Sequence, residues 1–147
     1  MSPVWDESYF PTAVATRGIT GVGRTVYFGA SDGASGNELW KSNGSSGGTV
    51  LVEDIHVGGD DSSPVGMTQV GSNVFFRAYT AASSNELWKS NGTAAGTQMV
   101  KEINPGAGPA GPNFLVKVGS TLLFAANDGT TGYELWITDG TRSGTKQ

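Results

Sequence analysis

The sequence contains no cysteine and only one histidine among its 147 residues. Disulfide bonds, thiolate metal sites and a cysteine nucleophile are therefore excluded, and stability has to come from packing. Apolar runs are only a few residues long, which excludes a membrane-spanning helix. The first residues, Met1 to Asp6, lack the basic and apolar regions of a secretory signal peptide, so we expect none in this chain.

Clusters of basic residues are absent as well. The formal net charge is −4, and no group of Lys or Arg is placed to neutralise several phosphates, so we expect no nucleic-acid partner. The acidic balance is compatible with simple solubility, which is the preferred interpretation, and with calcium binding as a weak alternative. No other cofactor is expected.

Glycine, by contrast, is abundant, with 23 residues, where about 7% of a chain is usual. An interval of 48 residues separates Gly23 from Gly71 and Gly71 from Gly119. The same interval relates three further motifs: Glu38-Leu39-Trp40, Glu86-Leu87-Trp88 and Glu134-Leu135-Trp136; Asn43-Gly44, Asn91-Gly92 and Asp139-Gly140; and Thr49, Thr97 and Thr145. These coincident motifs identify three copies of one unit.

Each unit has the pattern of four short strands. The segment 25–30 (TVYFGA) places apolar side chains on both faces, which is typical of a strand covered on both sides. The Glu-Leu-Trp strand ends at Asn-Gly or Asp-Gly, the dipeptides of a tight hairpin turn. A strand with weaker alternation follows at 49–55, then a loop at 56–63 and a short strand at 64–70. Four antiparallel strands per repeat of this length predict the blade of a β-propeller.

We therefore expect an all-β chain with three blades in a single repeat domain, 1–147. The expected repeats are 23–70, 71–118 and 119–147, with the segment 1–22 completing the last blade of a partner chain. Val4 is in register with Val52 and Val100, whereas the third unit ends before its outer strand. Because rings typically have about 4 to 8 blades, we predict that two chains close a six-bladed ring. The alternative is a fragment of a longer array.

These residues resemble a family of bacterial repeat proteins marked by Glu-Leu-Trp-x-x-Asp-Gly-Thr. The motif reads ELWKSNGS, ELWKSNGT and ELWITDGT here, so only the third copy keeps Asp-Gly-Thr. The resemblance covers nearly the whole chain. It implies a propeller-like module that is secreted or found at the cell surface, and it brings no catalytic residues.

The repeated motif supplies the first candidate site residues. Indole faces stack on sugar rings and a neighbouring carboxylate accepts hydroxyl hydrogen bonds, so a glycan pocket is one interpretation. Packing between blades is the favoured one, because a tryptophan recurs in the same strand of every unit. The residues concerned are Glu38, Trp40, Glu86, Trp88, Glu134 and Trp136.

Three aromatic residues break the repeat and are candidate ligand-binding residues. Trp5 is in register with Glu53 and Lys101, and burial at the seam between two chains is its favoured role. Tyr133 stands where the other units have Asn, and Tyr79 where they have Ser31 and Asn127. For the two tyrosines, loop packing is as reasonable as ligand binding.

No catalytic constellation is visible in the sequence. The acidic turn residues Asp32 and Asp128 lack the spacing of a calcium loop and are interpreted as turn residues, as is the unrepeated pair Asp60-Asp61. His56 lies in a loop and has no paired nucleophile. We expect no enzyme, and a glycoside hydrolase or lyase is only a remote alternative.

Two functions follow from these observations. The first is a non-catalytic recognition module that binds glycans or a surface protein through loops or grooves between blades. The second is a structural, self-assembling or engineered half-propeller scaffold with no natural ligand. Both predict a homodimer.

Overall fold

The computed structural model describes residues 18–106 and 108–147, which form eleven strands in three antiparallel sheets and no α-helix. The first sheet has the order β1-β2-β3-β4, with β1 Ile19–Val22, β2 Thr25–Ser31, β3 Asn37–Ser42 and β4 Val50–Glu53. The second has the order β5-β6-β7-β8, with β5 Val65–Val70, β6 Asn73–Thr80, β7 Ser84–Ser90 and β8 Gln98–Lys101. The third has the order β11-β10-β9, with β9 Asn113–Val118, β10 Thr121–Asn127 and β11 Tyr133–Thr138. The all-β prediction is confirmed.

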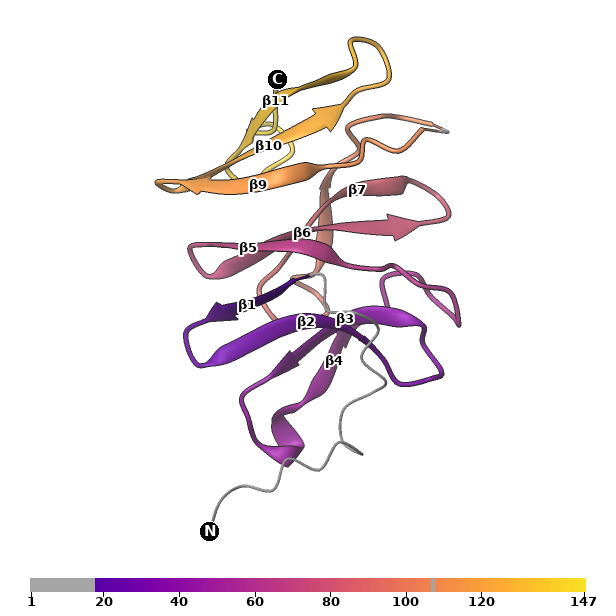
Figure 1. Ribbon diagram of the computed structural model, residues 1–147, viewed down its shortest axis with the longest axis vertical. Coiled ribbons are helices and arrows are strands. Elements are labelled where there is room, and N and C mark those ends of the chain that lie inside the picture. Colours follow the sequence, from indigo (N-terminus) through magenta and orange to yellow (C-terminus); the bar gives the residue numbers. More distant parts are fainter. Residues whose placement is uncertain (1–17, 107) are drawn as a thin grey trace.

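The sheets stack face to face along the long axis of the molecule, in the order of the sequence (Figure 1). The first strands of consecutive sheets are neighbours, β1 beside β5 and β5 beside β9. Strand β1 pairs with β2 of its own sheet, so residues 19–22 of the segment predicted to complete a partner's blade belong to the first sheet. Trp5 and the rest of that segment up to residue 17 lie outside the described residues.

The 48-residue repeat reappears in the strand register. The aromatic residue of the second strand lies opposite the motif tryptophan in every sheet, in the pairs Phe28 and Trp40, Phe76 and Trp88, and Phe124 and Trp136. The hairpin between the first and second strand also recurs. Its first residue is Gly23, Gly71 or Gly119, with φ of 63°, 61° and 59°, a backbone conformation that glycine adopts without steric cost.

Two hydrophobic cores lie between the sheets. In the first, Leu39 of the first sheet shares a core with Val74 and Phe76 of the second. In the second, Leu87 shares a core with Leu122 and Phe124 of the third. The motif leucine of one sheet is thus buried against the second strand of the next, which explains why that strand is apolar on both faces.

The connection after the Glu-Leu-Trp strand differs from the predicted tight hairpin turn. It runs over seven residues, 43–49, between the end of β3 and the start of β4. The Asn43 side chain accepts hydrogen bonds from the backbone N–H and hydroxyl of Ser45, at 3.0 and 2.7 Å. The hydroxyls of Ser42 and Thr49 lie 2.8 Å apart and close the loop. Side-chain hydrogen bonds replace the backbone geometry of a two-residue turn.

The same loop is built in the other two sheets. Asp139 accepts from the backbone N–H and hydroxyl of Thr141, as Asn43 does from Ser45, so either Asn or Asp serves this position. The closing hydroxyl pairs are Ser90 with Thr97 and Thr138 with Thr145, each at 2.7 Å. The repeated threonine therefore has a structural role.

Candidate functional site

The glutamates of the repeated motif hold loop backbone in the first two sheets. Glu38 is buried and accepts hydrogen bonds from the backbone N–H groups of Ile55 and Ser62, both at 2.8 Å, and from the Ser62 hydroxyl at 2.6 Å. Glu86 is buried too and accepts from the N–H groups of Ile103 and Asn104, at 3.0 and 3.2 Å. Each carboxyl thus ties the segment after the outer strand to its own sheet.

Burial raises the pKa of both carboxyls. It outweighs the hydrogen bonds that favour the charged form and raises the pKa of Glu86 to about 7. The pKa of Glu38 is also raised by burial, and the hydroxyl and N–H of Ser62 oppose that rise. The residue at the position of Ser62 in the second unit is Ala110, which has no hydroxyl to donate.

The third sheet presents the same motif uncovered. Leu135 is 66% exposed, whereas Leu39 and Leu87 are both 0% exposed. Glu134 and Tyr133 are exposed beside it. In the first two sheets, the next sheet covers the leucine, and the loop after the outer strand covers the glutamate. Among the described residues, the edge of β11 away from β10 is paired only through an isolated bridge between Ile137 and Lys146. We call Tyr133, Glu134 and Leu135 the β11 face.

Two of the three motif tryptophans lie at the contacts between sheets. Trp88 packs against the core between the first and second sheets, and Trp136 belongs to the core between the second and third. Trp136 also stacks on Phe124, with ring centroids 6.5 Å apart. The indole N–H groups of Trp40, Trp88 and Trp136 are buried without a hydrogen-bond partner among the described residues.

The two tyrosines that break the repeat occupy different surroundings. Tyr79, at the end of β6, is half-buried and makes an edge-to-face contact with His56, with ring centroids 5.3 Å apart. Tyr133 is largely exposed at the start of β11, and its hydroxyl lies next to Gly111. The structure does not bring the two tyrosines into one site, because they belong to different sheets.

The acidic loop residues form turns. One Asp32 oxygen accepts from the N–H groups of Ala34 and Ser35, and Asp128 does the same for Thr130 and Thr131, which lowers the pKa of both carboxyls. No group of three or more His, Asp or Glu side chains suited to a metal ion lies within the part of the chain that the structure describes.

Helices of the described residues were considered as membrane spans by their length and hydropathy. Within residues 18–106 and 108–147, none is long and apolar enough to cross a membrane.

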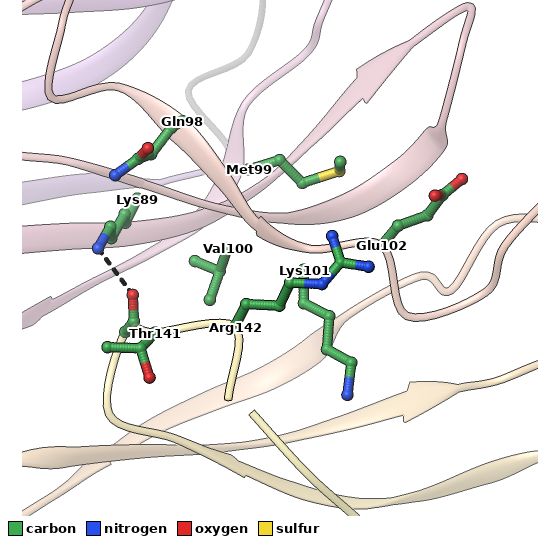
Figure 2. A pocket seen from close by; sticks show the side chains of 9 residues that line it. Lys89, Gln98, Met99, Val100, Lys101, Glu102, Thr141 and Arg142 are labelled. Atoms are coloured by element: carbon green, nitrogen blue, oxygen red, sulfur yellow. Dashed lines mark hydrogen bonds between the residues drawn. The ribbon is translucent and has the colours of Figure 1, made fainter. Parts of the chain in front are cut away.

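A half-open cleft of about 360 Å³ lies between the second and third sheets (Figure 2). Its lining comes from β7, from β8 and the residue that follows it, and from the turn after β11: Lys89, Gln98, Met99, Val100, Lys101, Glu102, Gly140, Thr141 and Arg142. Three cationic residues and one carboxylate residue therefore line this space, and we call it the cationic cleft.

Two of the cations in the cationic cleft are held by backbone oxygens. The Lys89 ammonium donates to the carbonyl oxygen of Gly140 at 2.7 Å, and that of Lys101 to Thr145 at 2.8 Å. Lys101 also lies 5.3 Å from the centroid of the Trp136 ring, within range of a cation–π contact. Two departures from the repeat mark the cleft in the sequence. Lys101 stands where the first unit has Glu53, and Arg142 stands where the second unit has Ala94.

Comparison with known proteins adds no relative. No protein-family model, curated protein or solved structure matches this chain. The resemblance to the Glu-Leu-Trp repeat proteins therefore stays a prediction from the motifs.

Proposed function

We propose that this chain is a non-catalytic assembly and recognition module, in which two copies close a six-bladed β-propeller. The observation that carries the proposal is the exposure of Leu135, because its counterparts Leu39 and Leu87 are fully buried. A leucine with 66% of its surface in water, at a position buried twice in the same chain, indicates a face that a partner covers.

The opposite end of the stack offers the complementary face. Ile19 is 63% exposed, whereas Met67, at the same position of the second sheet, is 9% exposed and packs in the core between the first two sheets. Placing the third sheet of one copy against the first sheet of another would repeat the contacts between the sheets within one chain. Such a head-to-tail contact closes a ring when its rotation is compatible with closure.

The N-terminal segment supplies a reason to prefer a second copy as the partner. Val4 stands in register with Val52 and Val100, which are buried residues of the outer strands β4 and β8. A strand formed around Val4 would pair with β11 and protect its open edge. The first sheet of that copy would cover Leu135, and the segment after the strand would bring backbone N–H groups toward Glu134.

Light scattering on the purified chain tests this assembly. We expect a mass of twice 15.1 kDa for the native chain and a single-chain mass for Leu135→Asp. Val57→Asp is the control, because Val57 is also an exposed apolar residue, with 84% of its surface exposed, but it lies in the loop between β4 and β5 and not in a strand of either contact face. A native chain that remains single, or a Leu135→Asp variant that keeps the double mass, would overturn the closure.

The recognition role is favoured by the cationic cleft, a surface feature that the repeat does not explain. Glycans and surface proteins remain the proposed ligand classes, with grooves between sheets as the contact surface. Binding to a glycan panel that is lost in a folded Tyr79→Ala variant would assign the contact to the loops beside the second sheet. Because Tyr133 is on the β11 face, the effect of Tyr133→Ala on binding is interpretable only when the mass is measured on the same sample.

A further inference from the structure

We propose that the cationic cleft binds a small anionic ligand through carboxylate, sulfate or phosphate groups. This inference deepens the recognition role proposed above and names the chemistry of its ligand. It stands on contacts within one chain, since the cleft is formed by the second and third sheets of the same molecule.

The cations of the cleft are positioned before any ligand arrives. Lys89 and Lys101 each donate to a carbonyl oxygen of the third unit, at 2.7 and 2.8 Å, and both are partly buried. These bonds restrict long side chains, so less conformational entropy is lost when an anion binds. A carbonyl oxygen carries no formal charge and does not neutralise an ammonium group. Hydrogen bonds from Thr141 lower the pKa of the exposed Asp139 carboxyl and the Lys89 ammonium adds to that effect, so one further carboxylate lies near this end of the cleft.

The chain contains its own comparison in the equivalent position between the first and second sheets. There Lys41 donates to the carbonyl oxygen of Gly92 at 2.7 Å, as Lys89 does to Gly140. The other charges differ: Glu53 and Asp54 stand where the cationic cleft has Lys101 and Glu102. Ala94 stands at the position of Arg142. The space between the first two sheets therefore has one cation and two carboxylates at the positions where the cationic cleft has three cations and one carboxylate.

This comparison shows whether the packing of the sheets accounts for the positive charge of the cleft. Two sheets of the same type pack together with Glu53 and Ala94 at these positions, so Lys101 and Arg142 are not required for the packing of sheets. Their concentration of positive charge also runs against the formal net charge of −4 of the chain. Charge of one sign lining a concave surface attracts ligands of the opposite sign.

The chemistry of the side chains defines the ligand class. The exposed Arg142 offers a planar guanidinium that binds carboxylate, sulfate or phosphate through two parallel hydrogen bonds. The volume of about 360 Å³ is near the lower end of ligand-sized clefts, roughly 300 to 1,000 Å³. A single anionic group or a short acidic saccharide matches this size.

Calorimetric titration at low ionic strength tests the inference. The probes are inorganic sulfate, inorganic phosphate and trigalacturonate, with neutral maltotriose as the comparison. The double variant Lys101→Glu, Arg142→Ala installs the residues of the first cleft, and we expect it to weaken anion binding by about 10- to 100-fold, since a charge-assisted hydrogen bond is lost. Arg24→Ala with Lys117→Glu makes the same charge change at exposed positions outside the cleft and should leave the affinity unchanged.

Each outcome has a defined meaning. If sulfate or phosphate binds and trigalacturonate does not, the ligand is an isolated anionic group. If trigalacturonate is the one probe that binds, the ligand is an acidic glycan. No heat with any anion, or equal affinity in native chain and double variant, would overturn the inference. If the double variant fails to fold, the exposed substitution Arg142→Ala alone gives the same test. The two proposals fail separately. A chain that has the mass of one copy and binds anions refutes ring closure but not anion binding in the cationic cleft. A chain that has the mass of two copies and binds no anion refutes anion binding but not ring closure.

Discussion

Glu86 and Glu38 occupy equivalent places but receive different numbers of hydrogen bonds. Ser62 donates its backbone N–H and its hydroxyl to Glu38, at 2.8 and 2.6 Å, whereas Glu86 accepts from the N–H of Asn104 instead, and Ala110 has no hydroxyl. The carbonyl oxygen of Ser62 accepts a hydrogen bond from the N–H of Tyr79. In the second unit, the carbonyl oxygen of Ala110 accepts the equivalent bond from the N–H of Asn127. The second sheet therefore lacks the hydroxyl hydrogen bond that Glu38 receives in the first.

We expect Ala110→Ser to stabilise the chain by about 1 kcal/mol at pH 8, because a hydrogen bond to a buried carboxylate is strengthened by charge. The substitution should also lower the pKa of Glu86. Denaturant unfolding at pH 8 and pH 5 checks this, and the gain should be smaller at pH 5, where Glu86 is protonated. Destabilisation at pH 8 would show that the hydroxyl does not reach Glu86.

The raised pKa of Glu86 also predicts how stability depends on pH. The folded chain holds its proton up to a pKa of about 7, against 4.5 for an ordinary Glu, so the folded state binds more protons between these values. The contribution of this group to stability is therefore greatest below pH 4.5 and is lost as pH rises through 7. The loss is at most about 3 kcal/mol.

Urea unfolding of the native chain and Glu86→Gln from pH 4.5 to 8 measures this contribution. The free energy of unfolding should fall with rising pH more steeply in the native chain, because Gln does not titrate. Parallel curves for the two proteins would contradict the raised pKa. The other titrating groups are present in both proteins and cancel in the difference.

At the scale of the element, the loop after the Glu-Leu-Trp strand contains two adjacent glycines, Gly47 and Gly48, with different surroundings. A Cβ on Gly48 would run into the Asn43 side chain, whereas a Cβ on Gly47 would meet nothing within 4 Å. Gly47 is replaced by Ala95 in the second unit, while Gly96 and Gly144 keep the position of Gly48. Glycine is thus needed only where the Asx side chain crosses the loop.

Gly48→Ala should destabilise the chain by about 1 to 3 kcal/mol, because the Asn43 side chain must leave its hydrogen bonds to Ser45. Gly47→Ala is the matched control and should be neutral or stabilising by up to about 1 kcal/mol through the unfolded state. Thermal unfolding of the two variants gives the comparison. Equal effects would show that the loop does not hold Asn43 in this position.

At the scale of the whole molecule, the stability cost of truncating the equivalent leucines Leu87 and Leu135 tests whether two chains assemble. Leu87→Ala removes a fully buried side chain and should cost about 2 to 5 kcal/mol at any protein concentration. Leu135→Ala should cost little at dilutions where single chains dominate. At high concentration its cost should approach that of Leu87→Ala, because ring closure would bury Leu135 in the same way.

Chemical unfolding at two protein concentrations, about a hundredfold apart, measures this difference. A cost of Leu135→Ala that is small at both concentrations would contradict burial of the β11 face in a dimer. A cost that is large at both would show that the side chain already contributes within one chain.

Much of the fold could be predicted from the residues alone. The repeated glycines at 23, 71 and 119, and the apolar second strand, indicated three all-β units, since turn chemistry and period-2 patterning act over neighbouring residues. The register also places Lys146 and Gln147 at the positions of Gln98 and Met99, the first two residues of β8. The closing of the ring itself stays a prediction.

Other features depended on which segments meet in space. The sequence placed a tight turn at Asn43-Gly44, but the pairing of Ser42 with Thr49 builds a longer loop. Burial of Glu38 and Glu86 required the following loop to fold back over each carboxyl. Lys101 and Arg142 are far apart along the chain and face one cleft only because the second and third sheets stack. Local patterns determine strands and turns, while desolvation and the meeting of charges arise only when the sheets come together.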